Sequence, residues 1–242
     1  MPHRELNLEE VADYLHVAPQ DVERLMREAD VPYHERGGRT IFYRAEIESW
    51  ASRRIIGLPT KRLDAYHEKS LRGLRPSLSQ DGLLSELLAE RDIDLELPSK
   101  TRPSVIRDMV SLAAKTDRVF DPRELLESVE AREALCPTAV EGGLALLHAR
   151  HHQEYRFEGS FLVLGRTIQP VPFGAPDGRP TMLFFLLCCQ DERIHLHTLA
   201  RLALIAAKTH VLTALRTAAT REEAYAALLA AEAEVLPQKP AE

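Results

Sequence analysis

Three short apolar segments in the second half of the chain constrain its fold most strongly. They are Leu144–Leu147, Phe161–Arg166 and Met182–Cys189, and their length is typical of buried strands. Apolar residues at helical spacing occur on either side of them, over Pro103–Ala114, Pro122–Ala131, Asp191–Ala207 and Glu222–Glu234. Strands that alternate with helices favour a sheet with helices on its faces. We therefore expect residues 82–238 to form one α/β (α+β) domain.

Residues 5–53 have the pattern of a second, smaller unit. Asn7 and Glu10 have the spacing of a capping-box-like helix start, and an amphipathic helix follows them. After a short break, a second amphipathic helix is expected from about Pro19 to Ala29, which makes a helix-turn-helix pattern. Gly37-Gly38 then separates two strand-like runs, as in a tight hairpin, and a short helix from Ala45 closes the unit.

This order of elements resembles the winged helix-turn-helix of the excisionase/MerR type. The resemblance implies that the second helix enters the major groove of DNA and that the hairpin lies along the backbone or minor groove. It implies DNA contacts from two sets of residues: Gln20, Arg24 and Arg27 on the helix, and Arg36, Arg39 and Arg44 on the wing. The alternative is that Arg24 and Arg27 only pair with Glu23 and Glu28 on a solvated helix. A single small module binds DNA weakly, so a homodimer is a possible binding form.

The charge distribution fits a small DNA-contacting patch on a protein that is not basic as a whole. The net charge is −6, which excludes a generally basic nucleic-acid coat protein. Residues 36–80 nevertheless hold ten Lys and Arg against four Asp and Glu. Charge alone fits a solvated linker with scattered arginines equally well. We expect a helix-turn-helix domain over residues 1–56, a basic linker over 57–81 and the α/β domain over 82–238.

The cysteines and the apolar runs indicate the compartment. Cys136, Cys188 and Cys189 form no C-x-x-C spacing, and adjacent Cys188 and Cys189 would point to opposite sides of a strand. A reduced, cytoplasmic protein is therefore expected. The N-terminus lacks an apolar signal region, and the longest apolar run is too short to span a bilayer, so no membrane insertion is expected.

The segment from Arg132 to His148 carries the residues best suited to chemistry. An arginine is followed by a Gly-Gly turn and a short apolar run that ends on His148, and His195 opens a Leu-rich helix downstream. Phosphoryl transfer between imidazoles needs a nucleophilic nitrogen, a neighbouring donor and a fixed positive charge. His148, His195 and Arg132 can supply these three groups.

The same order resembles the IIA phosphocarrier domain of the mannitol/fructose class of the bacterial sugar phosphotransferase system, including its nitrogen-regulatory relatives. The likeness covers essentially all of residues 82–236 and includes Arg132-Glu133, the loop from Thr138 to Gly143 and the run that ends on His148. It implies that His148 accepts a phosphoryl group from a histidine-containing phosphocarrier protein. It also implies that His195 supports His148 and that Arg132 binds phosphate. Thr138, Gly142 and Gly143 are expected to add hydroxyl and backbone N–H donors, and no cofactor or metal is required.

Some positions depart from the pattern of that family. Pro137 replaces a serine, Ala139 and Glu141 replace glycines of the loop, and Leu147 replaces the proline before the histidine. Glu141 is expected to place a negative charge near the phosphate, so a degenerate site that is not phosphorylated is an alternative.

The two resemblances together predict a phosphoryl-responsive transcriptional or signalling regulator that binds DNA through its N-terminal domain. One alternative is a phosphocarrier enzyme component that feeds a sugar permease, with the N-terminal unit as a protein docking domain. Another is a DNA-binding protein that uses a degenerate IIA fold only for dimerisation.

The histidine content also invites a metal-site interpretation. His148, His151 and His152 have His-x-x-His-His spacing, and His195 and His197 follow downstream. This spacing lacks the carboxylate and the helix context of zinc motifs, so we expect no metal.

Overall fold

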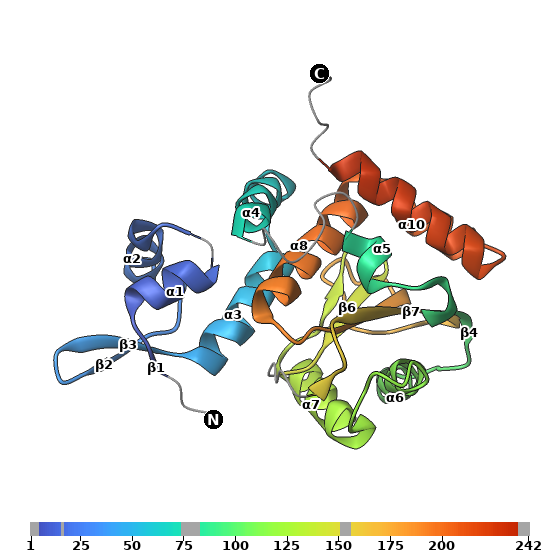
Figure 1. Cartoon of the computed structure of the whole chain (residues 1–242), viewed down its shortest axis with the longest axis horizontal. Helices are drawn as coiled ribbons and strands as arrows, with labels where there is room; N and C mark the ends of the chain where they lie inside the picture. Colours follow the sequence, from blue (N-terminus) through green and yellow to red (C-terminus); the bar gives the residue numbers. More distant parts are fainter. Residues whose placement is uncertain (1–4, 16, 74–82, 151–155, 237–242) are drawn as a thin grey trace.

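The computed structural model describes residues 5–15, 17–73, 83–150 and 156–236. Its N-terminal unit is a helix-turn-helix followed by a β-hairpin and a longer helix (Figure 1). The bounds are β1 (Glu5–Leu6), α1 (Leu8–Leu15), α2 (Pro19–Arg27), β2 (His34–Arg36), β3 (Arg39–Tyr43) and α3 (Arg44–Ile56). The three strands form an antiparallel sheet in the order β1-β3-β2. The expected winged helix-turn-helix is confirmed.

Local sequence signals explain where this unit begins and turns. The Asn7 backbone N–H donates to Glu10 at 2.8 Å and the Glu10 N–H donates to Asn7 Oδ1 at 2.9 Å, which is the expected reciprocal cap of α1. Gly37 and Gly38 at the tip of the hairpin have φ of 60° and 74°. Two successive left-handed residues are what a tight two-residue hairpin turn requires.

The C-terminal unit is built around a five-stranded mixed sheet in the order β4-β7-β8-β6-β5. β4 and β7 are parallel, as are β6 and β8, whereas the other neighbours are antiparallel. The elements are α5 (Leu83–Leu87), a 3-10 helix η1 (Glu90–Asp92), β4 (Ile93–Leu97), α6 (Arg102–Ala114), α7 (Pro122–Leu135), β5 (Ala139–Val140), β6 (Leu144–His148), β7 (Phe161–Val171), β8 (Thr181–Cys188), α8 (Glu192–Lys208), α9 (Val211–Thr217) and α10 (Arg221–Val235). The expected α/β domain is confirmed, and the structure adds α5, η1, β4, β5 and α9 to the elements named from the sequence.

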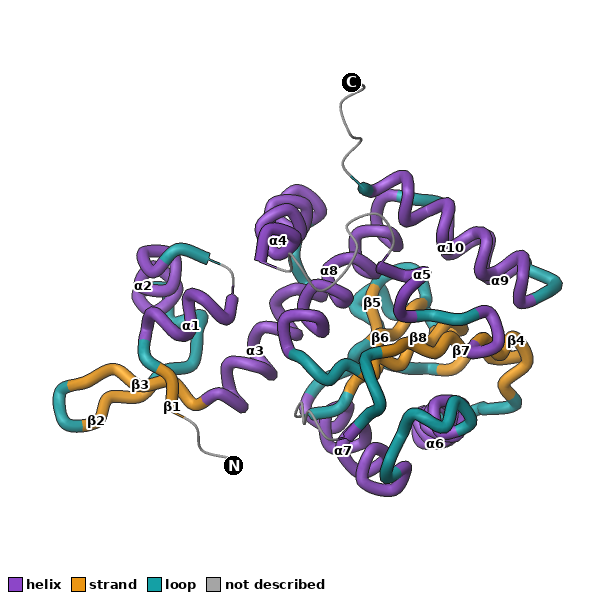
Figure 2. Tube along the Cα trace, viewed as in Figure 1, coloured by secondary structure: helices purple, strands orange, loops and turns teal. Residues whose placement is uncertain are grey.

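Helices cover both faces of this sheet (Figure 2). Alternate residues of β6 enter different cores: Leu144 and Leu146 pack on the α8 side, whereas Ala145 and Leu147 pack on the side of α6 and α7. A strand buried on both faces has no polar side, which explains the continuous apolar runs of the sequence. Cys188 and Cys189 likewise lie in the two opposite cores, and the three cysteines are free.

The segment expected as a basic linker contains helix α4 (Thr60–Gly73), which packs against α8 beside α3 (Figure 1). Leu63 of α4 is buried, and so are Ile47 and Ile55 of α3. They belong to the same cluster of buried residues as the α8 face of the sheet. The N-terminal unit therefore shares a hydrophobic core with the C-terminal unit.

Helices α8 and α9 are joined by a sharp bend. Within the described ranges, no single helix has the length and apolar character needed to cross a membrane. One bent pair, Arg193–Lys208 with Val211–Thr217, meets those criteria of length and composition only when taken together.

Candidate functional site

Strands β6 and β8 bring His148 and His195 together. The two strands are parallel neighbours, with His148 opposite Leu187, so they end at the same edge of the sheet. β6 ends on His148, and the chain leaves β8 into α8, whose N-cap Asp191 accepts from the backbone N–H of Arg193 at 2.7 Å. His195 lies in the first turn of α8. The two imidazole centroids are 4.8 Å apart, with the rings tilted by 53°.

Arg132, near the end of α7, is bound directly to His148. Its Nε donates to His148 Nε2 at 2.9 Å, and its Nη1 donates to the Cys136 carbonyl at 3.0 Å. Only 2% of Arg132 is exposed. Its Nη2 is buried and has no hydrogen-bond partner among the described residues. No carboxylate of the described residues forms an ion pair with Arg132. A buried positive charge with an unused donor suits an anion that arrives later.

The hydrogen bonds of His148 define which of its ring nitrogens is nucleophilic. Nδ1 lies 2.9 Å from the Leu146 carbonyl oxygen. A carbonyl only accepts, so Nδ1 carries the proton and Nε2 keeps its lone pair. This assignment agrees with Nε2 accepting from Arg132. Nε2 is therefore the nitrogen able to attack an electrophile.

Thr138 supports the loop between Arg132 and β6. Its hydroxyl donates to Glu133 Oε2 at 2.7 Å, and its carbonyl accepts from the Leu146 backbone N–H at 3.1 Å. Burial raises the pKa of Glu133, opposed by the hydrogen bonds from Thr138 and by the nearby arginines Arg102 and Arg132. The Thr138 hydroxyl proton is thus already used within the protein.

The structure does not bring Gly142 and Gly143 to His148. Both have positive φ, 84° and 76°, in the turn that precedes β6, whereas His148 ends the strand. Five residues of strand separate Gly143 from His148 by about 16 Å. The Gly142 N–H donates to Asp177 at 3.0 Å, and this bond is the main cause that lowers the pKa of that carboxyl. The expected role of the two glycines as phosphate donors is not retained, and the exposed Glu141 likewise lies away from the histidine.

Sequence reasoning missed two contacts at the site. Ser52, on α3, has its Oγ 3.4 Å from His195 Nε2, and the two residues are 143 positions apart, so no local signal could have found this contact. Cys136 also accepts from Arg132 through its Sγ at 3.3 Å, and it follows that arginine by one helical turn. His148 and His195 are only 2% and 1% exposed. In this arrangement the site is therefore closed.

The expected DNA-binding residues of α2 are exposed. Gln20, Arg24 and Arg27 lie on the surface of this helix. Arg24 pairs with Asp21 at 2.8 Å and approaches Glu28 at 4.0 Å. These contacts agree in part with the alternative of a solvated helix. No ion pair of Arg27 is found within the described residues.

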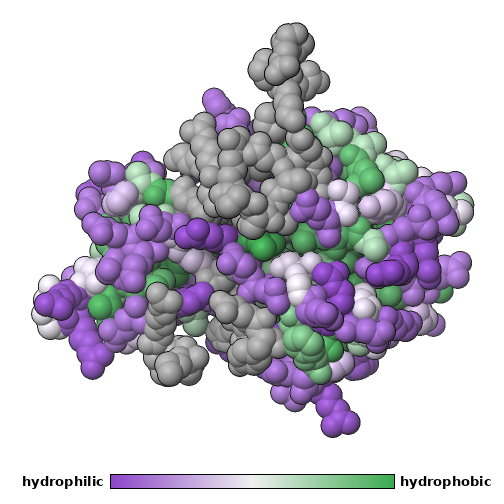
Figure 3. Space-filling view, viewed as in Figure 1, coloured by the Kyte–Doolittle hydropathy of each residue, from purple (hydrophilic) through white to green (hydrophobic). Residues whose placement is uncertain are grey.

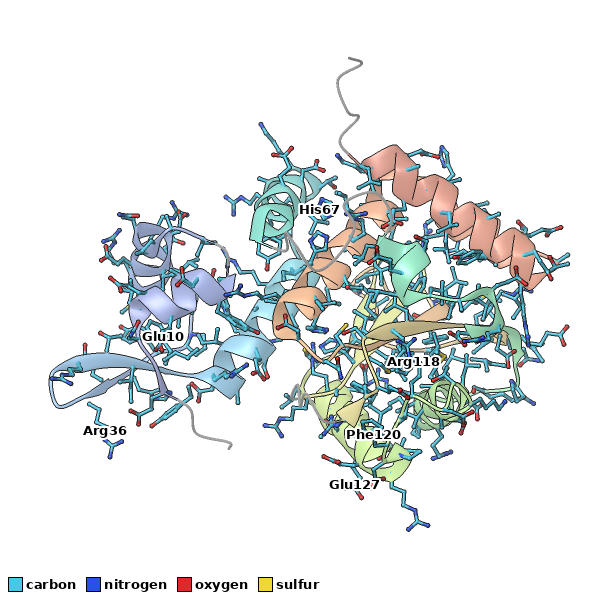
Figure 4. All side chains as sticks on the ribbon, viewed as in Figure 1. Glu10, Arg36, His67, Arg118, Phe120 and Glu127 are labelled. Atoms are coloured by element: carbon cyan, nitrogen blue, oxygen red, sulfur yellow. The ribbon has the colours of Figure 1, made fainter. Side chains whose placement is uncertain are left out.

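The wing carries the other three expected residues. Arg36 extends away from the body of the protein and pairs with Glu5 at 3.0 Å (Figure 4). Arg44, in the first turn of α3, pairs with Glu48 at 3.1 Å. Arg39 is exposed at the tip of the hairpin. Hydrophilic side chains predominate on the visible surface of this unit (Figure 3).

The metal-site interpretation gains no support from the described part of the chain. No group of three or more His, Cys, Asp and Glu side chains there is arranged to hold a metal ion. His151 and His152 lie outside the described residues.

Comparison with known families decides the classification. Residues 86–231 match the family described as phosphoenolpyruvate-dependent sugar phosphotransferase system, EIIA 2. The chain belongs to this family. Residues 5–55 match a helix-turn-helix domain family. The histidine pair and Arg132 thus lie in an EIIA type-2 domain that follows a helix-turn-helix domain.

Individual relatives agree with this classification. A nitrogen regulatory protein of Pseudomonas aeruginosa is 28% identical over 144 residues, which are 59% of this chain and 92% of that protein. The fructose-specific EIIABC component of Bacillus subtilis is 28% identical over 153 residues, 62% of this chain but only 22% of that longer protein. Among solved structures, nitrogen regulatory protein IIA-Ntr of Neisseria meningitidis superimposes with a TM-score of 0.55 at 28% identity and covers 60% of this chain and 99% of its own.

Proposed function

We propose that this protein is a phosphoryl-responsive regulator, in which His148 accepts a phosphoryl group from a histidine-containing phosphocarrier protein and the N-terminal domain binds DNA. The observation that carries the proposal is the hydrogen bond from buried Arg132 Nε to His148 Nε2, with Nδ1 held at the Leu146 carbonyl. The nitrogen with the lone pair and the positive charge that phosphate needs are therefore adjacent. A cytoplasmic location, expected from the free cysteines, is part of the proposal.

The transfer step follows from these contacts. The lone pair of His148 Nε2 attacks the phosphorus, the new N–P bond forms, and the N–P bond of the donor breaks with its electron pair left on the donor imidazole. Such a transfer depends on positioning and charge stabilisation. Arg132 moves its donors from Nε2 to the phosphoryl oxygens, and His195 lies close enough to donate to one of them.

A reconstituted relay tests the acceptor. The full chain is incubated with phosphoenolpyruvate, enzyme I and the phosphocarrier protein, and its intact mass is measured. We expect a gain of one phosphoryl group that is lost in His148→Ala. His67→Ala is the matched control, because His67 is also a buried histidine that accepts from an arginine. No gain by the wild-type chain, with an active relay on a known acceptor, would instead favour a degenerate IIA domain.

DNA binding by the N-terminal domain is supported by the exposed arginines of α2 and the wing. Arg27 and Arg39 are exposed, and no ion pair of either side chain is found within the described residues. A module of this size contacts few base pairs, so we propose that a homodimer binds two half-sites.

Selection of bound duplexes from a random library tests this part. Affinity for the selected duplex is then measured by fluorescence anisotropy over a range of salt concentrations. We expect Arg27→Ala and Arg39→Ala to weaken binding, and a phosphate-contacting arginine to reduce the salt slope by about one ion. Arg123→Ala, an exposed arginine on α7, is the control. Unchanged affinity in both α2 and wing variants would reject DNA contact by this surface.

A further inference from the structure

Helix α3 of the N-terminal domain lies against the helix that carries His195. α3 and α8 pack side by side (Figure 1). Ser52 is a polar residue at this contact, with its Oγ 3.4 Å from His195 Nε2 and only 4% of its surface exposed. The winged helix is therefore in direct contact with the candidate phosphorylation site.

Helix α4 makes a second contact with the same helix. His67 accepts from Arg201 Nε at 2.6 Å and stacks on His197 with 4.8 Å between ring centroids (Figure 4). Near the end of α8, Lys208 donates to Asp64 at 2.5 Å. Helix α8 thus carries His195 at the site, and further along it carries the residues that bind α4.

The arrangement of these helices is incompatible with phosphoryl transfer as it stands. A donor imidazole must bring its phosphorus to within about 3.5 Å of Nε2 in line with the bond that breaks. His148 and His195 are 2% and 1% exposed, and Arg132 occupies Nε2. The site must open before it can be phosphorylated.

We propose that α3, seated on α8 through Ser52, is the closed state of a switch, and that a phosphoryl group on His148 and the seated α3 exclude each other. The inference rests on the proposed phosphorylation of His148. The phosphoryl group brings about −1.5 to −2 charges and three acceptor oxygens into a buried space. His195 turns to one of those oxygens and leaves Ser52. Phosphorylation thereby releases the helix-turn-helix domain from its fixed orientation on the IIA domain.

Coupling of this kind is reciprocal, so loosening α3 must favour phosphorylation. Ser52→Arg in the full chain places a bulky charged side chain at the contact. Ser49→Arg makes the same change one turn earlier on the same helix, at a half-buried position for which no contact with either histidine is described. We expect Ser52→Arg to raise the initial rate of phosphoryl uptake about tenfold, with Ser49→Arg close to wild type. Circular dichroism confirms that both variants are folded.

A second measurement needs no variant at the contact. Hydrogen–deuterium exchange of the wild-type chain is compared before and after phosphorylation, with His148→Ala in the same relay as the control. We expect faster exchange in α3 and α4 on phosphorylation and no change in α6, which covers the opposite face of the sheet.

The outcomes separate the switch from the proposed function. Uptake on His148 with equal rates in wild type and Ser52→Arg, and with unchanged exchange in α3, rejects the switch and leaves the phosphorylation intact. No uptake by any variant rejects the phosphorylation itself and the switch with it.

Discussion

Two buried arginine–histidine pairs in this protein look alike and differ in one respect. Arg132 Nε donates to His148 at 2.9 Å, and Arg201 Nε donates to His67 at 2.6 Å. Arg201 also pairs with buried Glu232 at 2.6 Å. Arg132 has no such carboxylate among the described residues and keeps one nitrogen without a partner there.

The difference separates a structural pair from the pair at the proposed phosphoryl site. The charge of Arg201 is compensated, so its histidine serves to hold α4 on α8. Arg132 lies near buried Glu133 but makes no ion pair among the described residues, so its unused donor is available to an incoming anion. A buried arginine next to a histidine therefore does not by itself identify a phosphoryl site; the unpaired donor of Arg132 is what supports the proposed one.

The largest expected effect is on stability, at the structural pair. Arg201→Gln leaves the Glu232 carboxylate buried without its cation, and we expect the free energy of unfolding to fall by roughly 3–5 kcal/mol. Urea unfolding measures this loss. The folded variant should still take up a phosphoryl group on His148. Arg201→Lys, which keeps the charge, should lose less.

Arg132→Gln should mainly slow phosphoryl uptake and have a smaller effect on stability. It removes the charge that stabilises the transferring phosphoryl group, and we expect the uptake rate to fall roughly 100-fold or more. Buried Glu133 loses one nearby positive charge but keeps its hydrogen bonds from Thr138 and the charge of Arg102, so this variant should lose less stability than Arg201→Gln. Time-resolved intact mass and urea unfolding check both halves. An uptake rate within threefold of wild type would contradict the role given to Arg132.

The stability of the folded chain should depend on pH through His67. Burial, together with Arg201 and Lys208, lowers the pKa of His67 to about 3, with Asp64 opposing. The unfolded chain has an ordinary histidine with a pKa of 6.5 and binds a proton that the folded chain does not. The free energy of unfolding therefore falls as pH drops from 6.5 towards 3. Between pH 7 and pH 5, wild type should lose roughly 2 kcal/mol more than His67→Gln. Equal losses in urea unfolding at the two pH values would show that His67 titrates normally.

The smallest effect on phosphoryl uptake is expected at the far end of β6. In Gly143→Ala, the new Cβ would lie 3.1 Å from the Pro180 carbonyl oxygen, on a backbone with φ of 76°. We expect a loss of about 1–3 kcal/mol and an unchanged rate of phosphoryl uptake. Gly178→Ala is the control, because its φ of 68° carries the same strain but its Cβ meets open space. If uptake were slower in Gly143→Ala but not in Gly178→Ala, the turn at Gly142 and Gly143 would have a role in phosphoryl transfer after all.

The features that depend on local sequence pattern, such as individual strands and helices, could be predicted from the sequence. The run that ends on His148 and the helix that opens before His195 were predictable from apolar periodicity, and parallel neighbours in a sheet explain why they meet. The phosphate role expected for Gly142 and Gly143 did not follow, because a strand carries residues close in sequence to opposite ends of the sheet. The contacts of Ser52 and His67 could not be predicted from the sequence, because they depend on how α3 and α4 pack on α8.

Nuclear magnetic resonance of the chain labelled with ¹⁵N-histidine tests the central claim most directly. Long-range ¹H–¹⁵N spectra are recorded before and after treatment with the phosphocarrier relay. We expect a single ring, absent from the spectrum of His148→Ala, to gain a phosphorus coupling at Nε2 and to keep its proton on Nδ1. Phosphorylation of Nδ1, of another histidine or of none would contradict it.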